Sequence, residues 1–322
     1  MSNRRYRSPR WVEKHKASLA TLGGVVVGGV PLKSPVMTAS GTAGHSNELA
    51  NYFDMSILGA TVVKSLSAEP WAGNSAPRVH PTPSGMINAV GLQGPGMAAW
   101  IRNDLPRLNE TGITTVLSVW GRSVEDYAIA ARMAGSLSAG QVAAIEVNLS
   151  CPNLEGRRGI FAHDAELSAQ VVDAVKVAGI PLWAKLSPNT DRLIEVATAV
   201  VEAGADALTL VNTALGMVID VETGRPVLGN GGGGLSGAAI HPIAVRAVHE
   251  VHAALPNVDI IGVGGVRDAT DAIELMSAGA AAIQVGTATF ADPRAACRVS
   301  EQMVGWMQSH RFRSWSELKD RG

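Results

Sequence analysis

The chain of 322 residues is long for one ordinary domain and short for two large ones. Hydrophobic residues make up 46% and charged residues 17% of the sequence, a balance that excludes an intrinsically disordered protein. The formal net charge is −1, so we expect no general attraction to nucleic acid. An eight-stranded α/β barrel, at roughly 250 residues plus extensions, fits this length as a single unit.

Residues 1–16 hold six basic side chains and one acid. We treat residues 1–22 as a basic N-terminal arm ahead of a single barrel domain of residues 23–322. The favoured interpretation of the arm is a solvated tail, and the second is a segment that docks on a partner subunit or a second copy through Trp11. A membrane or targeting role is disfavoured, because no amphipathic helix with an apolar face is evident.

Eight short apolar runs alternate with longer amphipathic stretches, as parallel strands buried on both faces alternate with helices. The expected strands are residues 35–40, 60–65, 114–119, 143–148, 181–187, 205–212, 258–265 and 281–287. The expected helices are residues 123–135, 164–178, 191–203, 239–255, 268–278 and 292–308. Eight such units in order favour a closed (β/α)8 TIM barrel over an open doubly wound sheet.

Local signals refine this architecture. Ser123, Asp191 and Asp268 are expected to cap the starts of three helices, and Gly179, Gly204 and Gly279 to end three. Residues 23–27 and 30–33 flank a Gly28-Gly29 turn, which predicts a β-hairpin that closes the bottom of the barrel. The segments 66–97 and 212–238 are too long for simple loops, and we place them at the carboxyl-terminal rim, where barrels build active sites.

Polar residues and glycines end the expected strands. In chain order they are Ser40, Gly41, Lys64, Ser65, Ser118, Asn148, Lys185, Asn212, Thr213, Gly264, Gly265, Gly286 and Thr287. Each lysine alone could reach solvent and each asparagine alone could satisfy backbone groups, but their convergence on one rim indicates a site. Glycine pairs after the seventh and eighth strands expose backbone N–H groups that bind phosphate. The pattern predicts a phosphate-bearing cofactor.

The two cysteines differ in their surroundings. Cys151 lies in the segment Asn-Leu-Ser-Cys-Pro-Asn at residues 148–153, at the mouth of the fourth strand, which is an unusual place for a packing thiol. Cys297 lies in an Ala-rich helix and is expected in the core. Two cysteines cannot form a disulfide framework or a metal cluster, so we expect no metal and a cytoplasmic location. No run of 18 apolar residues exists, so we expect no spanning helix.

Several longer motifs carry a resemblance to a known family. They are TASGT (38–42), VVKS (62–65), GMINAVGLQGPG (85–96), NLSCPN (148–153), AKLSPN (184–189), LTLVNTALGMVIDVETGRPVLGNGGGGLSG (208–237), IIGVGGV (260–266) and QVGTATF (284–290). Over about residues 23–308 the chain resembles the dihydroorotate dehydrogenases of class 1, subgroup B, which use FMN. The resemblance implies oxidation of dihydroorotate to orotate in pyrimidine biosynthesis, and a homodimer.

The resemblance also implies a set of site residues. Those implied for FMN are Ser40, Lys64, Ser65, Ser118, Asn148, Lys185, Val211, Gly237, Gly264, Gly265, Gly286 and Thr287. Those implied for dihydroorotate or orotate are Lys64, Asn88, Ala89, Val90, Gly91, Leu92, Asn148, Asn153, Asn212 and Thr213. Cys151 would be the base that takes a proton while a hydride passes to N5 of FMN.

Three features depart from the family or limit what this chain does alone. Ser118 stands where the family usually has Asn, so we expect one flavin hydrogen bond to be shorter-reaching or bridged by water. The glycine run 231–234 is unusual and is expected to loosen the phosphate-side loop. Subgroup B enzymes pass electrons through a subunit with FAD and an iron–sulfur cluster to NAD⁺; this chain has no cysteine cluster or Rossmann motif, so it needs such a partner or another acceptor.

Two other functions stay open. An FMN barrel that acts on another dihydropyrimidine is disfavoured, because Lys64 and residues 88–92 suit a substrate that carries a carboxylate. A ligand-binding barrel without turnover is disfavoured by the presence of Cys151.

Overall fold

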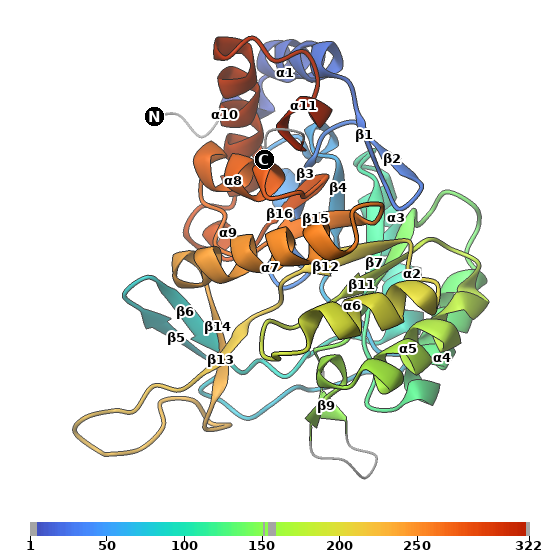
Figure 1. Ribbon diagram of the computed structural model, residues 1–322, viewed down its shortest axis with the longest axis vertical. Helices are drawn as coiled ribbons and strands as arrows, with labels where there is room; N and C mark the ends of the chain where they lie inside the picture. Colours follow the sequence, from blue (N-terminus) through green and yellow to red (C-terminus); the bar gives the residue numbers. More distant parts are fainter. Residues whose placement is uncertain (1–4, 151, 154–158, 320–322) are drawn as a thin grey trace.

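The computed structural model describes residues 5–150, 152, 153 and 159–319. Within them eight parallel strands close into a barrel in the order β11-β12-β15-β16-β3-β4-β7-β8 (Figure 1). The strands are β3 (Val36–Thr38), β4 (Ala60–Val62), β7 (Thr115–Val119), β8 (Ala144–Asn148), β11 (Leu182–Lys185), β12 (Ala207–Leu210), β15 (Asp259–Val263) and β16 (Ala282–Val285). All eight expected strands are present, and the (β/α)8 prediction is confirmed.

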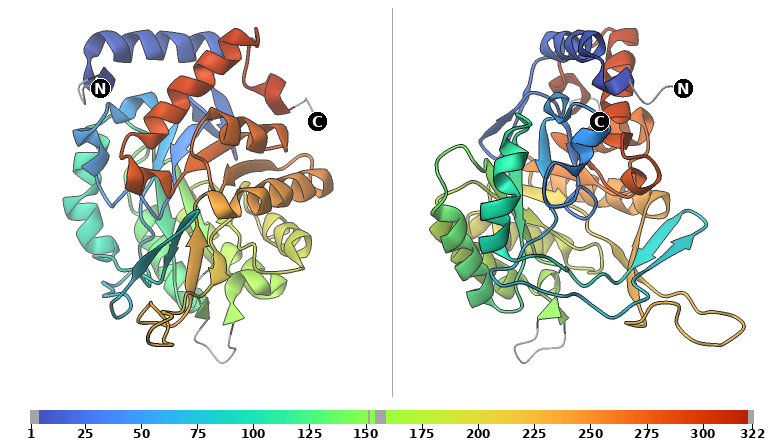
Figure 2. Two further views of the ribbon diagram at one scale, coloured as in Figure 1. Left: turned by 90° about the vertical axis from the view of Figure 1, so that its left-hand side faces the viewer. Right: turned by 180° about the vertical axis from the view of Figure 1, so that it is seen from behind.

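Helices surround this barrel (Figure 2). The α-helices after the first strand are α2 (Met97–Asn103), α3 (Leu105–Asn109), α4 (Val124–Gly135), α5 (Ala165–Val175), α6 (Leu193–Glu202), α7 (His241–Ala254), α8 (Ala269–Ser277), α9 (Ala288–Ala291), α10 (Ala295–Ser309) and α11 (Ser316–Lys319). Short 3₁₀ turns are η1 (Arg5–Arg7), η2 (Glu48–Asn51), η3 (Met55–Ile57), η4 (Phe161–His163), η5 (Lys176–Ala178) and η6 (Ala238–Ile240). The six expected helices are all present, with Cys297 buried in the core on α10.

Two of the three expected helix caps are confirmed. The Ser123 hydroxyl accepts a hydrogen bond from the Asp126 N–H, and the Asp268 carboxylate accepts one from the Thr270 N–H. The prediction that Asp191 caps a helix is wrong. Here the Thr190 hydroxyl accepts from the Arg192 N–H, and α6 begins after Arg192 without a side-chain cap. The three expected glycines each follow the last helical residues with positive φ, as at Gly179 (φ 63°).

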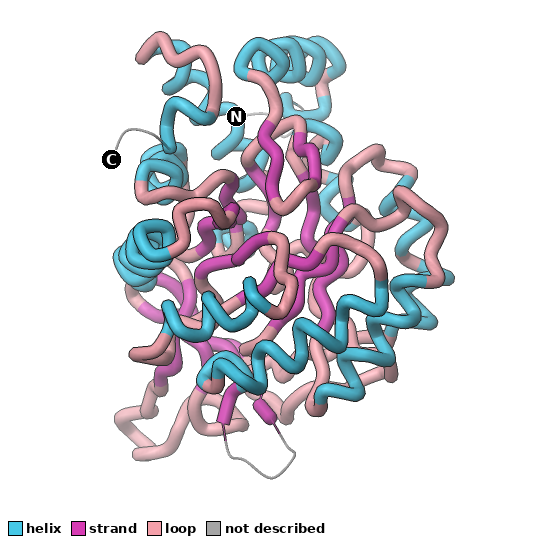
Figure 3. Tube along the Cα trace, turned by 45° about the vertical axis from the view of Figure 1, so that its right-hand side comes forward, coloured by secondary structure: helices cyan, strands magenta, loops and turns pink. Residues whose placement is uncertain are grey.

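A β-hairpin closes the bottom of the barrel, as predicted (Figure 3). Its strands β1 (Val25–Val27) and β2 (Val30–Leu32) pair antiparallel, and the Gly28 N–H donates to the Asp259 carboxylate at 3.0 Å. A Cβ on Gly28 would lie 2.9 Å from Trp183 Nε1. Only glycine, which has no Cβ, therefore lets the turn pack this closely against the barrel interior. The hairpin packs against apolar interior residues: Met37, Ala60, Val62, Val116, Ala144, Trp183, Ala207, Ile261 and Ala282.

The N-terminal segment is a packed helix, so the interpretation as a solvated tail is wrong for residues 5–22. Helix α1 (Pro9–Leu22) lies against α10 (Figure 2). It buries a stripe at helical spacing, Val12, His15, Leu19 and Leu22. The expectation that no apolar-faced helix exists here failed because the stripe is narrow and includes a histidine among charged neighbours. The division between residues 1–22 and 23–322 stays a prediction.

The two long segments at the rim build one four-stranded antiparallel sheet in the order β13-β14-β6-β5 (Figure 1, lower left). Its strands are β5 (Val79–Thr82), β6 (Gly85–Asn88), β13 (Ala214–Gly216) and β14 (Gly233–Ser236), while β9 (Pro152–Asn153) pairs with β10 (Gly159–Ile160). The expected loosening by the glycine run is wrong for Gly233 and Gly234, which lie in β14. A Cβ on Gly233 would lie 2.5 Å from the Asn88 carbonyl oxygen, so glycine permits this close pairing.

Candidate functional site

A cavity of about 920 Å³ lies at the carboxyl ends of the barrel strands, beside the four-stranded sheet. Its volume is near the upper end of the range of about 300–1,000 Å³ found for cofactor and ligand pockets. The structure brings most of the site residues implied by the resemblance to this one cavity. They are Ser40, Lys64, Ser65, Asn88, Ala89, Val90, Gly91, Leu92, Asn148, Lys185, Val211, Asn212, Thr213, Gly237, Gly264, Gly265, Gly286 and Thr287.

Three implied residues stand apart from this set. Ser118 is fully buried behind Ser65, with the two hydroxyl oxygens 2.8 Å apart, and it does not line the cavity. Its expected contact with a flavin therefore stays a prediction, and its observed contact is with Ser65. Cys151 and the side chain of Asn153 lie outside the described residues.

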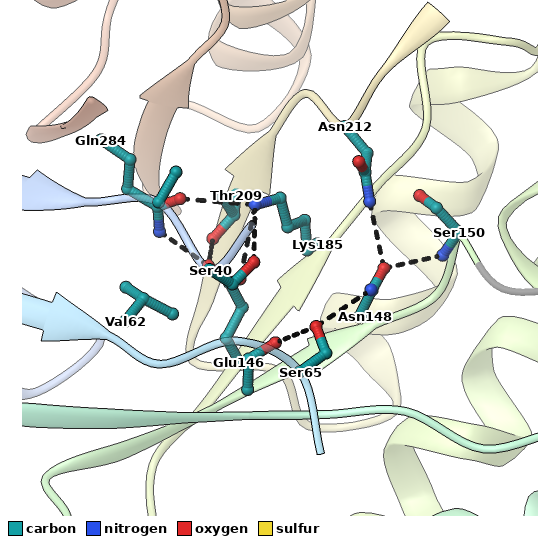
Figure 4. Close-up of polar contacts among 12 residues, drawn as sticks. Ser40, Val62, Ser65, Glu146, Asn148, Ser150, Lys185, Thr209, Asn212 and Gln284 are labelled. Atoms are coloured by element: carbon teal, nitrogen blue, oxygen red, sulfur yellow. Dashed lines mark hydrogen bonds and ion pairs between the residues drawn. The ribbon is translucent and has the colours of Figure 1, made fainter. Parts of the chain in front are cut away.

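A chain of hydrogen bonds fixes the amide groups at one side of the cavity (Figure 4). Asn148 Nδ2 donates to the Ser65 hydroxyl at 3.2 Å, and Asn212 Nδ2 donates to Asn148 Oδ1 at 3.1 Å. The backbone N–H of Ser150 donates to the same oxygen at 3.2 Å. Because each amide is held by a neighbour, both asparagines present defined donor and acceptor edges to a planar polar ligand.

Lys64 supplies a positive charge at the cavity wall. It is largely buried, and burial lowers the pKa of its ammonium group from the usual value of 10.5. An anion placed against this ammonium would stabilise the charged form. A carboxylate or phosphate is therefore a suitable ligand for this position.

Glycines let three backbone segments converge in another part of the cavity lining. Gly264 and Gly265 follow β15, and a Cβ on Gly265 would lie 2.6 Å from the His241 Cβ at the start of α7. A Cβ on Gly237 would lie 2.6 Å from the Gly85 Cα. The Thr287 hydroxyl donates to the Ser236 hydroxyl at 2.8 Å and ties the segment after β16 to the same place. A concavity lined by glycine backbone, as in this glycine cradle, is a common place for phosphate to bind, because N–H groups are accessible there.

A buried polar cluster lies on the barrel side of the cavity, and sequence analysis found only Lys185 of it. Lys185 Nζ lies 3.4 Å from the Glu146 carboxylate, which accepts hydrogen bonds from Gln284 Nε2 at 2.7 Å and from the Thr209 hydroxyl at 3.3 Å (Figure 4). The signal was an acid and an amide inside the apolar strands AAIEVN and AAIQVG. Such residues inside buried strands indicate a polar partner in the interior.

A cation–π contact at the rim, between Arg122 and Trp71, was also not predicted from the sequence. The Arg122 guanidinium carbon lies 3.7 Å from the centre of the Trp71 ring, and Trp71 Nε1 donates to the Gly91 carbonyl at 2.9 Å. Both side chains line the cavity. The contact joins the segment that holds residues 88–92 to the barrel rim after β7. The sequence signal was an arginine two residues beyond Trp120, at the end of an apolar strand.

The described residues contain no group of three or more His, Cys, Asp or Glu side chains that could hold a metal ion. None of their helices combines the length and the apolar character needed to cross a membrane.

Comparison with known proteins gives a consistent result. The family model described as dihydroorotate dehydrogenase matches residues 24–307. Among curated proteins, the chain is 45% identical over 295 residues to one from Geotalea uraniireducens and 46% identical over 296 residues to one from Geobacter sp., covering 91% of this chain and 96% of each relative. A relative from Bacillus pumilus is 42% identical over 290 residues, 90% of this chain and 93% of the relative. All three are named dihydroorotate dehydrogenase B (NAD(+)), catalytic subunit. The chain belongs to the dihydroorotate dehydrogenase family.

Proposed function

We propose that this chain binds FMN in the cavity and oxidises dihydroorotate to orotate. Membership of the family makes it an oxidoreductase of pyrimidine biosynthesis. The observation that carries the assignment of the site is the convergence, in one cavity, of the glycine cradle, Lys64, Lys185 and the amide chain. The cradle fits the phosphate of FMN and the volume leaves room for a second planar molecule.

Each group has a proposed task in the reaction. Lys64 binds the substrate carboxylate, and Asn148 and Asn212 bind the carbonyl and N–H edges of the ring. The bound FMN would supply the acceptor for the hydride that leaves dihydroorotate. Cys151 takes the accompanying proton, so that one proton and one hydride are removed and a carbon–carbon double bond forms. The hydrogen bond from the Ser150 N–H to Asn148 Oδ1 fixes the backbone at the end of β8, directly before Cys151 in the sequence.

The same proposal covers the partners and the location. The relatives are named catalytic subunits of NAD(+)-dependent enzymes. This supports a separate electron-transfer subunit, which we propose contains FAD and an iron–sulfur cluster. We further propose that the chain forms a homodimer and works in the cytoplasm.

Flavin reduction measured without oxygen tests the proposed reaction. Dihydroorotate added to the FMN-loaded protein should bleach the flavin absorbance, and Cys151→Ala should slow this step by about 10²–10⁴-fold, the usual contribution of a general base. Cys297→Ala is the matched control, because its thiol is buried in the core, and it should bleach at the wild-type rate. An unchanged flavin spectrum in the wild type would contradict the substrate, and full-speed bleaching by Cys151→Ala would contradict the base.

The partner has its own test. The isolated FMN-loaded chain, given dihydroorotate and NAD⁺, should form NADH at a negligible rate although its flavin is bleached. Rapid NADH formation by the chain alone would contradict the need for an electron-transfer subunit.

A further inference from the structure

Glu146 lies inside the barrel, behind the cavity wall. Its side chain is fully buried and does not line the cavity, whereas its partner Lys185 is 4% exposed and does line it. A buried carboxylate is strongly disfavoured unless it is paired and hydrogen-bonded. The proposed roles of the site residues leave this carboxylate without a function, so its presence needs an explanation.

The contacts of this pair are unequal. Glu146 is held firmly on one side, with Gln284 Nε2 at 2.7 Å from its carboxylate. Lys185 Nζ donates to three acceptors, Ser40 Oγ at 3.3 Å, Glu146 Oε1 at 3.4 Å and Gln284 Oε1 at 3.4 Å. These three distances exceed the usual range of 2.7–3.2 Å for N–H···O hydrogen bonds. The carboxylate is therefore the fixed member of the pair, and the ammonium group is held mainly by charge.

We propose that Glu146 is a positioning residue that keeps the Lys185 ammonium at the cavity wall and offsets its positive charge, and so sets the reduction potential of the bound FMN. The inference rests on the proposed function, since it requires FMN in the cavity. Lys185 is the charge that the ligand meets, and Glu146 acts through it.

The reason is electrostatic. A reduced flavin carries more negative charge than an oxidised one, so a nearby cation stabilises the reduced form and a nearby anion destabilises it. Inside a protein such charges interact over an effective dielectric constant of about 20, well below that of water. Glu146 and Lys185 carry opposite charges, so the pair has no net charge. The carboxylate therefore cancels part of the stabilisation that the Lys185 ammonium alone would give to the reduced flavin.

The test is the equilibrium ratio of reduced to oxidised FMN, measured by redox titration of the loaded protein at pH 8, where reduced flavin is anionic. Glu146→Gln keeps the shape of the side chain and removes its charge. We expect it to raise this ratio by about tenfold or more at a fixed potential, which is about 30 mV for a two-electron couple. Thr209→Val is the matched control, because it removes one hydrogen bond to the same carboxylate and leaves the charge; it should keep the wild-type ratio.

A second variant protects the test against misfolding of the first. Replacing both partners, Glu146→Gln with Lys185→Met, leaves no unpaired buried charge, and such replacements are often neutral or stabilising. Its ratio should stay within about threefold of wild type if the two charges balance, and should fall much further if Lys185 acts alone. A Glu146→Gln protein that binds FMN with the wild-type ratio would overturn the inference. A wild-type protein that binds no FMN would instead overturn the proposed function.

Discussion

Two layers of side chains inside the barrel lie two residues apart on the same strands and have opposite chemical character. The lower layer, against the hairpin, includes Val62, Val116, Ala144, Trp183, Ala207 and Ala282. Two residues further along the chain, on the same strands or, for Lys64, just after β4, are Lys64, Ser118, Glu146, Lys185, Thr209 and Gln284. Because strand side chains alternate with a period of two, both sets point to the same side of the sheet.

The difference separates stability from function along the barrel axis. The lower layer removes apolar surface from water and stabilises the fold. The upper layer buries charges and hydroxyls, which stabilise a fold less well than packed apolar side chains of similar volume. Two of these groups, Lys64 and Lys185, line the cavity, where a ligand would meet them. Changes in the lower layer should therefore alter stability, and changes to the upper-layer side chains that line the cavity, Lys64 and Lys185, should alter binding.

The largest expected effect is in the lower layer. Trp183 is fully buried between the barrel strands and the hairpin. Trp183→Ala should lower the free energy of unfolding by about 3–5 kcal/mol, because it removes a large aromatic side chain from a packed interior. Chemical denaturation measures this, and the folded fraction should still bind FMN with the wild-type affinity.

Trp183→Phe is the control for that change. Within the described residues Trp183 Nε1–H has no hydrogen-bond acceptor, so phenylalanine removes an unsatisfied donor and keeps most of the ring. Its loss of stability should be smaller than that of Trp183→Ala, because it empties less of the packed interior. If Trp183→Ala weakened FMN binding tenfold while leaving the unfolding free energy unchanged, the separation of the two layers would be wrong.

The next effect is in the upper layer, where one substitution should raise stability and weaken ligand binding. Burial lowers the pKa of Lys64, so its charge opposes folding in the absence of an anion. Lys64→Met should raise the unfolding temperature of the ligand-free protein. The same change should weaken orotate binding to the FMN-loaded protein by about 10- to 150-fold, the value of a charged hydrogen bond of about 1.5–3 kcal/mol.

Lys33→Met provides the comparison at the other end of the barrel, because Lys33 directly follows the hairpin strand β2. It should leave orotate binding unchanged in a titration of flavin absorbance. A Lys64→Met protein that unfolds at a lower temperature and binds orotate normally would show that Lys64 supports the structure instead of the ligand.

The sequence could predict the layers only in part. Lys64, Asn148 and Lys185 were found because they end apolar strands, where the geometry of a barrel requires convergence. Glu146 and Gln284 lie inside the strands, where a single polar residue looks like an exception in an apolar run. Their partners come from strands far apart in the sequence, and only the closed barrel brings them together.

The smallest predicted effect concerns a buried polar group outside both layers. His15 on α1 lies with Nε2 2.9 Å from the Ser300 hydroxyl, and burial lowers its pKa to about 4. The unfolded chain therefore binds more protons than the folded one between about pH 6.5 and pH 4. The free energy of unfolding should fall by about 2 kcal/mol as the pH is lowered from 6.5 to 4.5.

His15→Gln isolates this contribution, because glutamine does not titrate and can still reach Ser300. Denaturation at pH 6.5 and at pH 4.5 should show a smaller loss of stability in the variant than in the wild type, while other titrating groups contribute equally to both. Parallel losses would mean that His15 is not held neutral by burial. FMN affinity at pH 6.5 should be the same in both proteins, because α1 packs against α10 and its side chains do not line the cavity. A buried polar group would then affect the bound ligand only where it lines the cavity, as Lys64 does, or contacts a residue that lines it, as Glu146 does.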